Sequence, residues 1–182
     1  MAIEYKVMVA VDGEGGIGKE GRVPWNLPTD LAWLEHSTLS TIDPSKRNAV
    51  VFGRRTFYSI PDCDRPYKGR FNVVLTSSVR VDGDGEHLKF VRDWKDIEEL
   101  VRDEKMSSSL ECVWILGGHN VYREALERGI VSEVRITSIQ QSFECDSFFP
   151  RFEWKKDFEL KEEKRVEENG CTYTMSTWRR KI

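Results

Sequence analysis

Residues 114–122 read WILGGHNVY, and this stretch sets the expected architecture. Its first residues are apolar and typical of a buried strand, Gly117-Gly118 forms a turn, and helical spacing runs from Asn120 to Arg128. Gly129 follows as a helix stop. Small residues at such a turn leave backbone amides free to meet a phosphate group. The stretch predicts a strand, a turn and a helix with a phosphate site at the turn.

The same design occurs earlier, where FGRRT at residues 52–56 places Gly53 between a strand and a helix. Two helix N-termini at one sheet edge favour a dinucleotide that lies across this edge; the alternative is that both glycines only form turns. Arg54, Arg55 and Arg92 are candidates for an additional phosphate, because guanidinium binds phosphate as a fork. A solvated surface position is the alternative for each arginine.

Strand and helix patterns alternate along the whole chain. Strand patterns cover Tyr5–Val11, Asn48–Phe52, Phe71–Thr76, His87–Val91, Cys112–Leu116 and Glu133–Ile139. Helical patterns follow Thr29 and Asp93, both good N-caps, and cover Arg54–Ser59. Near the end, Phe158–Glu167 and Cys171–Arg179 flank Asn169-Gly170, a strong hairpin signal, whereas Ser107–Ser109 is expected to be a loop. We therefore predict an α/β fold: a single domain over residues 1–182 with a mainly parallel eight-stranded sheet, a C-terminal antiparallel hairpin and flanking helices.

The composition narrows the class of protein. The 182 residues carry a net charge of −3, which gives no sign of a nucleic-acid surface. No apolar run approaches the roughly 18 residues of a membrane-spanning helix, and the N-terminus lacks a secretory signal pattern. The four cysteines are dispersed, so we expect reduced thiols, no metal site and a cytoplasmic protein; they are Cys63, Cys112, Cys145 and Cys171.

A glycine-rich loop follows the first strand and matches two phosphate-binding patterns. Gly13–Lys19 fits GxxxxGK, but Glu20 stands where a P-loop needs Ser or Thr for Mg²⁺. Gly16–Gly21 fits GxGxxG, but Pro24 follows closely, and a dinucleotide-binding loop must open a helix. Both readings fail their contextual test. A flexible loop leaving a strand fits, yet it leaves the glycine content unexplained.

Asp30 is the first candidate for chemistry, because it stands in the first turn of a predicted helix. Its apolar neighbours Leu27, Leu31 and Leu34 suggest a partly desolvated carboxylate, which can accept two parallel N–H bonds from an amidine-like edge. The alternative is that Asp30 only complements the helix dipole, worth about 0.3–1 kcal/mol.

Five ordered segments together resemble dihydrofolate reductase over about residues 4–179: VAVDGEGGIGKEGRVPWNLPTDL, FGRRTFYSIP, RPYKGRFNVVLTSS, WILGGHNVY and DSFFP. The resemblance implies reduction of 7,8-dihydrofolate to tetrahydrofolate by NADPH, in support of one-carbon metabolism and thymidylate and purine synthesis. It also implies binding of antifolate inhibitors, a monomer, and no nucleic-acid or membrane partner. The glycine-rich loop would then be a mobile lid over the nicotinamide. With the sequence ending at Ile182, we expect no fused thymidylate synthase.

Two other functions stay open. The first is a reductase of the same fold that acts on another pteridine or a pyrimidine. Arg70 argues against it, because an arginine at this position would bind a carboxylate group of the substrate. A non-catalytic nucleotide- or RNA-binding module is the other, and the net charge of −3 and the expected burial of Asp30 weaken it.

The resemblance also implies residue roles. Asp30 would bind the pterin edge, Trp25 would help to order a nearby water, Thr137 would support the carboxylate, and Arg70 would bind the α-carboxylate of the folate glutamate. Desolvation is expected to raise the pKa of Asp30 above its ordinary value of about 3.9. Other substrate-binding positions are Met8, Val9, Leu31, Leu34, Ile60 and Leu116. Cofactor-binding positions are Ala10, Gly16, Ile17, Gly18, Gly21, Arg54, Arg55, Thr56, Thr76, Ser77, Ser78, Arg92, Gly117, Gly118, His119, Asn120, Val121 and Tyr122.

The sequence departs from the family pattern at several positions. Asp30 stands five positions after Trp25, as in bacterial members, whereas the insert Pro61–Arg70 is animal-like. Leu34 replaces a usual aromatic residue, and Ser77 stands where many animal members have arginine. Tyr67 is bulkier than the usual leucine and narrows the expected pocket mouth.

Overall fold

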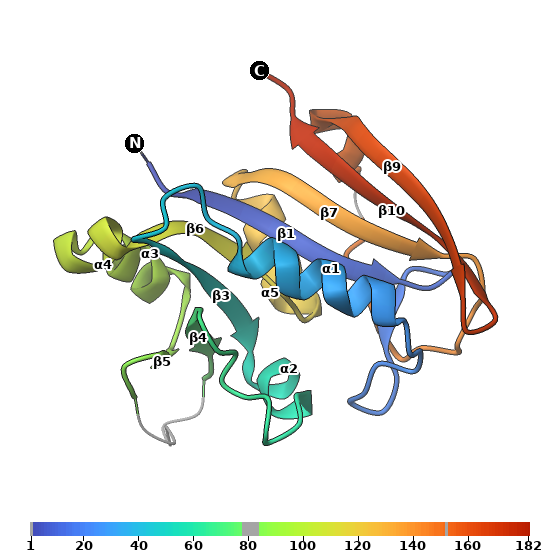
Figure 1. Cartoon of the computed structure of the whole chain (residues 1–182), viewed down its shortest axis with the longest axis horizontal. Coiled ribbons are helices and arrows are strands. Elements are labelled where there is room, and N and C mark those ends of the chain that lie inside the picture. The colour runs from blue at the N-terminus through green and yellow to red at the C-terminus, as the bar shows by residue number, and fades with distance from the viewer. Residues whose placement is uncertain (1, 78–83, 152) are drawn as a thin grey trace.

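The computed structural model describes residues 2–77, 84–151 and 153–182, and its main feature is one eight-stranded sheet (Figure 1). The strand order is β5-β4-β3-β6-β1-β7-β10-β9. The strands are β1 (Glu4–Val11), β3 (Arg47–Gly53), β4 (Phe71–Leu75), β5 (Leu88–Val91), β6 (Leu110–Ile115), β7 (Val131–Ile139), β9 (Phe158–Glu168) and β10 (Cys171–Arg180). A separate two-stranded sheet pairs β2 (Gly16–Gly18) with β8 (Ser147–Phe148).

The directions of the strands confirm the predicted sheet. From β5 to β7 all neighbours are parallel, and β10 is antiparallel to both β7 and β9. The central strands read as continuous apolar runs because both of their faces are covered; Asn48–Phe52 of β3 is buried throughout. The carboxyl ends of β1, β3 and β6 therefore meet at one edge of the sheet, where a ligand site is expected.

The helices cover both faces of the sheet. They are α1 (Pro28–Leu39), α2 (Arg54–Ser59), α3 (Trp94–Arg102), α4 (Glu104–Ser109) and α5 (His119–Glu127), and Trp154–Asp157 forms a 3₁₀ turn, η1. Alternation along β1 assigns the faces: Val7 and Val9 pack in a cluster with α3 and α5, whereas Met8 packs in a cluster with α1 and α2. Figure 1 shows α1 across one face and α5 behind the other.

Several local signals have the predicted structure. The Asp93 side chain caps α3 by accepting a hydrogen bond from the Asp96 amide at 3.0 Å. Gly129 follows α5 with a φ of +67°. Asn169 and Gly170 connect β9 to β10 with φ values of 49° and 74°, and two positive φ values are what a tight hairpin turn of this kind requires.

Two local predictions are wrong. Thr29 is not the N-cap of α1, because the helix begins at Pro28, a residue suited to a first helical position, and Leu27 precedes it. Ser107–Ser109 is not a loop, because it completes α4. Asp103 starts that helix by accepting from the Met106 amide, and the three serine hydroxyls donate to carbonyls three residues back, so they are satisfied inside the helix.

The described helices include none that is both long and apolar enough to cross a bilayer. All four cysteines are free.

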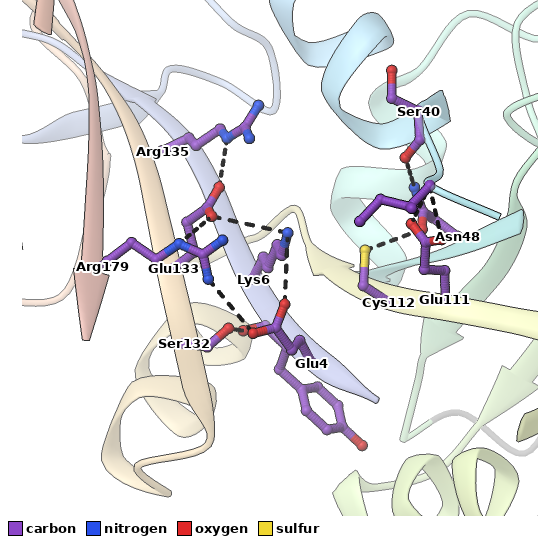
Figure 2. A network of polar contacts seen from close by, with 12 residues as sticks. Glu4, Lys6, Ser40, Asn48, Glu111, Cys112, Ser132, Glu133, Arg135 and Arg179 are labelled. Atoms are coloured by element: carbon purple, nitrogen blue, oxygen red, sulfur yellow. Dashed lines mark hydrogen bonds and ion pairs between the residues drawn. The ribbon is translucent and has the colours of Figure 1, made fainter. Parts of the chain in front are cut away.

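An ion-pair network centred on the buried Glu133 joins β1, β7 and β10 beside α1 (Figure 2). Glu133 of β7 is 2% exposed and lies 2.7 Å from the Arg135 guanidinium, 3.1 Å from that of Arg179 and 3.9 Å from the Lys6 ammonium. Arg135 also donates to the Ser37 hydroxyl of α1 at 2.7 Å. The network therefore fixes the C-terminal half of α1 against β7.

Candidate active site

A cavity of about 690 Å³ lies at the carboxyl ends of β1, β3 and β6, between α1 and α2. Its lining comes from segments distant in sequence and includes many of the predicted positions. These are Met8, Val9, Ala10, Ile17, Trp25, Asp30, Leu31, Leu34, Thr56, Ile60, Arg70, Leu116, Gly117, Gly118 and Tyr122. The structure therefore brings the predicted substrate positions other than Thr137, and part of the predicted cofactor positions, to one cavity.

Other predicted positions lie outside this lining, and their roles stay predictions. Thr137 is 1% exposed and reaches the cavity only through Asp30. Ser78 lies outside the described residues. The remaining ones are Gly16, Gly18, Gly21, Arg54, Arg55, Thr76, Ser77, Arg92, His119, Asn120 and Val121.

The cavity also contains residues that sequence reasoning did not select. They are Val23, Leu27, Glu35, Phe52, Ser59, Pro61, Cys63, Asp64 and Lys68, and Tyr67 had been expected only to narrow the mouth. Phe52 carries a usable signal, since it is the last side chain of a buried strand before Gly53. The loop residues at the mouth carry none, because loops have no periodicity from which to infer a direction.

Asp30 lies in the first turn of α1 and is partly buried. Its Oδ1 accepts a hydrogen bond from the Thr137 hydroxyl of β7 at 2.5 Å. Burial raises the pKa of Asp30, the Thr137 hydrogen bond opposes this shift, and the negative charge of Glu168 adds to it. The predicted direction is thus confirmed: desolvation dominates. The Thr137 hydroxyl donates to one carboxylate oxygen, and among the described residues the second oxygen has no hydrogen-bond partner.

Arg70 immediately precedes β4 and is 5% exposed. Its Nε donates to the Lys68 carbonyl at 3.0 Å and one terminal nitrogen donates to the Thr38 hydroxyl at 3.0 Å. The guanidinium stacks on the Tyr67 ring, 4.6 Å from its centroid. Among the described residues, no carboxylate lies within ion-pair distance of Arg70. A rigid, desolvated guanidinium in a cavity wall without an acidic partner is suited to an anionic ligand group.

Two helix N-termini meet at the cavity, as the sequence predicted. Gly53 precedes α2 and Gly118 precedes α5, and the Gly53 amide donates to the Gly117 carbonyl at 2.8 Å. A Cβ on Gly117 would lie 3.1 Å from the Tyr122 ring, and one on Gly118 would lie 3.4 Å from the Thr56 hydroxyl. The Tyr122 hydroxyl in turn donates to the Met8 carbonyl at 2.8 Å. The two turns therefore lie against each other beside the cavity, and their glycines leave the backbone there accessible.

The glycine-rich loop is pinned to the segment around β8. The buried Asp12 carboxylate accepts from the amides of Glu14, Gly16 and Phe143 at 3.0, 2.8 and 2.9 Å. Burial alone would raise its pKa, but these hydrogen bonds prevail and lower it. A Cβ on Gly16 would lie 2.6 Å from the Cys145 sulfur, so a side chain is excluded there. Asp12 was missed by the sequence reasoning, although an Asp before glycines at a strand end is a known turn signal.

Trp25 lies between this loop and α1. Its ring is half-buried, lines the cavity and makes an edge contact with Phe143, with ring centroids 5.4 Å apart. The loop, Trp25 and α1 therefore form one continuous wall.

Comparisons with known proteins agree in one family. The sequence profile described as dihydrofolate reductase matches residues 4–180. Bifunctional dihydrofolate reductase-thymidylate synthase 1 of Arabidopsis thaliana is 39% identical over 181 residues, which is 96% of this chain and 34% of the relative. This chain thus spans about a third of that bifunctional relative. Dihydrofolate reductase of Bos taurus is 34% identical over 94% of both chains. The solved structure of Schistosoma mansoni dihydrofolate reductase has a TM-score of 0.86 at 29% identity, with 100% of both chains covered.

Proposed function

This chain belongs to the dihydrofolate reductase family, and from that premise we propose that it reduces 7,8-dihydrofolate to 5,6,7,8-tetrahydrofolate with NADPH. The observation that carries the proposal is Asp30, a desolvated carboxylate hydrogen-bonded to Thr137 inside a cavity whose other walls are mainly apolar. Residues 1–182 would act as one catalytic domain, a monomer in the cytoplasm, and supply one-carbon metabolism and thymidylate and purine synthesis.

The turns at Gly53 and at Gly117-Gly118 support a nicotinamide dinucleotide, because they place the starts of α2 and α5 side by side and carry no side chain that would keep a pyrophosphate from the backbone. When bound, NADPH supplies the hydride. Arg54 and Arg55 are exposed at the start of α2 and are suited to bind its 2′-phosphate. Met8, Val9 and Ala10 at the end of β1 would provide the surface against which the reacting rings are held.

Asp30 would bind the amidine-like edge of the pterin through both oxygens. A carboxylate engaged at that edge cannot also deliver the proton to the distant ring nitrogen that must receive it. Asp30 therefore favours protonation of this nitrogen electrostatically, and water delivers the proton. Trp25, at the wall between the loop and α1, would help to order that water.

Arg70 supports a folate rather than a smaller pteridine or pyrimidine. Its guanidinium is buried and without an acidic partner among the described residues, and it would bind the α-carboxylate of the glutamate tail. Antifolate inhibitors that share the amidine-like edge would use the same Asp30 carboxylate.

One assay tests the proposal: loss of absorbance at 340 nm after the protein is mixed with NADPH and dihydrofolate. We expect steady turnover that requires both compounds. Turnover with an unrelated pteridine or pyrimidine but not with dihydrofolate would identify a different reductase. NADPH binding without turnover on any of these substrates would contradict an enzymatic role.

A further inference from the structure

The first turn of α1 is capped by a residue from the opposite end of the chain. Leu27 precedes the helix and offers no side-chain acceptor, so the first amides of α1 need another partner. The Glu168 carboxylate accepts from the Thr29 amide at 2.9 Å and from the Thr29 hydroxyl at 2.7 Å, across 139 residues of sequence. The tip of the β9–β10 hairpin therefore supplies the cap.

Glu168 is itself held in place by neutral donors. The hydroxyl of the fully buried Tyr173 donates to it at 2.5 Å, and the neighbouring Asn169 amide nitrogen donates to the Asn26 carbonyl at 2.8 Å. Among the described residues, no cation lies within ion-pair distance of Glu168. The hydrogen bonds from Tyr173 and Thr29 lower the pKa of Glu168, so its negative charge is present at neutral pH and is not paired.

Asp30 directly follows Thr29, and its charged surroundings are few. Thr137 on β7 provides a neutral donor, and Arg135 on the same strand is engaged by Glu133 and Ser37. Tyr122 on α5 and Tyr173 on β10 also interact electrostatically with Asp30. Burial raises the pKa of both phenols, and the Asp30 charge adds to this, so they stay neutral. Arg135 is paired with Glu133, so Glu168 is the charged group among these neighbours that has no ion-pair partner.

We propose that Glu168 is a positioning residue of the active site: it fixes the first turn of α1 and keeps a like charge beside Asp30. The inference rests on the proposed function of Asp30. Its consequence is that the hairpin tip, which does not line the cavity, affects how readily Asp30 ionises. A neutral cap such as serine would hold the helix equally well but would have no such effect.

The test separates charge from geometry with two substitutions. Glu168→Gln keeps an acceptor for Thr29 and Tyr173 but removes the charge, and Glu168→Ala removes both. Glu167→Gln is the matched control, because Glu167 is exposed, pairs with Arg165 and carries the same charge one residue away. The measurements are the pH profile of kcat/KM, which reports the free enzyme, and an NMR titration of the ¹³C-labelled Asp30 carboxyl.

With Glu168→Gln, the acid limb of the kcat/KM profile and the Asp30 titration should both move to lower pH. With Glu168→Ala the same displacement should be accompanied by a fall in Tm of roughly 2–4 °C, as expected for loss of one cap. Glu167→Gln should move neither. If Glu168→Ala lowers Tm while the Asp30 titration stays in place in both variants, Glu168 is only a structural cap and the proposal is wrong. The NMR result stands even if the wild type fails to reduce dihydrofolate, so the two proposals fail separately.

Discussion

Asp30→Asn is the substitution that tests the proposed chemistry most directly. Asparagine keeps the size of the side chain and one carbonyl acceptor, but it presents an NH₂ group to a substrate N–H donor where the carboxylate presented an oxygen. A hydrogen bond to a charged group is worth about 1.5–3 kcal/mol, so loss of one bond and weakening of the other should cost about 3 kcal/mol. This corresponds to a loss of about 10²-fold in kcat/KM at pH 7.

The loss should depend on pH in a defined direction. Because burial raises the pKa of Asp30, the wild type reaches its neutral form at a higher pH than an exposed aspartate would. The two enzymes should therefore converge as the pH falls through that pKa. The effect of Asp30 on stability depends on pH in the opposite direction to its effect on activity. A carboxyl whose pKa is raised in the folded state stabilises the fold below its unfolded pKa of about 3.9. This stabilisation is lost as the pH rises through the folded pKa. Asp30→Asn should consequently melt at a higher temperature than the wild type at pH 7, and this advantage should vanish in acid.

The measurements are pH–rate profiles of Asp30→Asn and the wild type, together with thermal melts and NADPH titrations. Glu163→Gln serves as the control, because Glu163 is exposed on β9 and this substitution also removes one negative charge. NADPH affinity should be unaffected. Turnover of Asp30→Asn close to that of the wild type at pH 7 would mean that Asp30 only complements the dipole of α1.

Three further predictions concern charged side chains. Arg70→Ala should raise the KM for dihydrofolate roughly 30-fold in the 340 nm assay, which corresponds to a loss of about 2 kcal/mol in binding free energy. The KM for a dihydropterin without the glutamate tail should not change. Equal increases for both substrates would mean that Arg70 has a structural role. The wild type should prefer NADPH over NADH by at least about tenfold in kcat/KM. Arg54→Ala should reduce this preference without lowering kcat/KM for NADH. Equal use of both cofactors by the wild type would refute the proposal that these arginines bind the 2′-phosphate. Glu133→Gln should lower the free energy of unfolding by about 1.5–3 kcal/mol in urea denaturation, because it removes the buried negative charge to which Arg135 and Arg179 bind. An unchanged free energy of unfolding would contradict this role.

Local patterns predicted most of the fold because local forces determine those elements. The strand, turn and helix of residues 114–122 and the Asn169-Gly170 hairpin depend on side-chain periodicity and on φ preferences that are visible in a few residues. The cap of α1 depends instead on Glu168, and no pattern near Thr29 points to a residue that far away. Local reasoning chose the nearest hydroxyl and was wrong.

The residues of the candidate site also fall into those that local sequence could predict and those that it could not. Gly117, Gly118 and Asp30 were identifiable from their own surroundings, since strand ends and first helical turns have recognisable chemistry. Thr137 followed only from the resemblance, because its contact with Asp30 depends on how β7 aligns with α1. The cluster of amides around Asp12 was not foreseen, because it requires two loops to meet.

The position of β1 in the middle of the sheet has a consequence for synthesis on the ribosome. Val7 aligns with Ile115 of β6 on one side and with Val134 of β7 on the other. At about 5–20 residues per second, the nascent strand has neither neighbour for roughly 5–20 s after it emerges. During this interval Val7, Val9 and Val11, which are buried in the folded protein, are exposed to solvent. Exposed apolar segments of this kind favour aggregation and chaperone binding. A pause in translation before β6 should therefore lower the yield of folded protein, whereas one after β7 should have little effect.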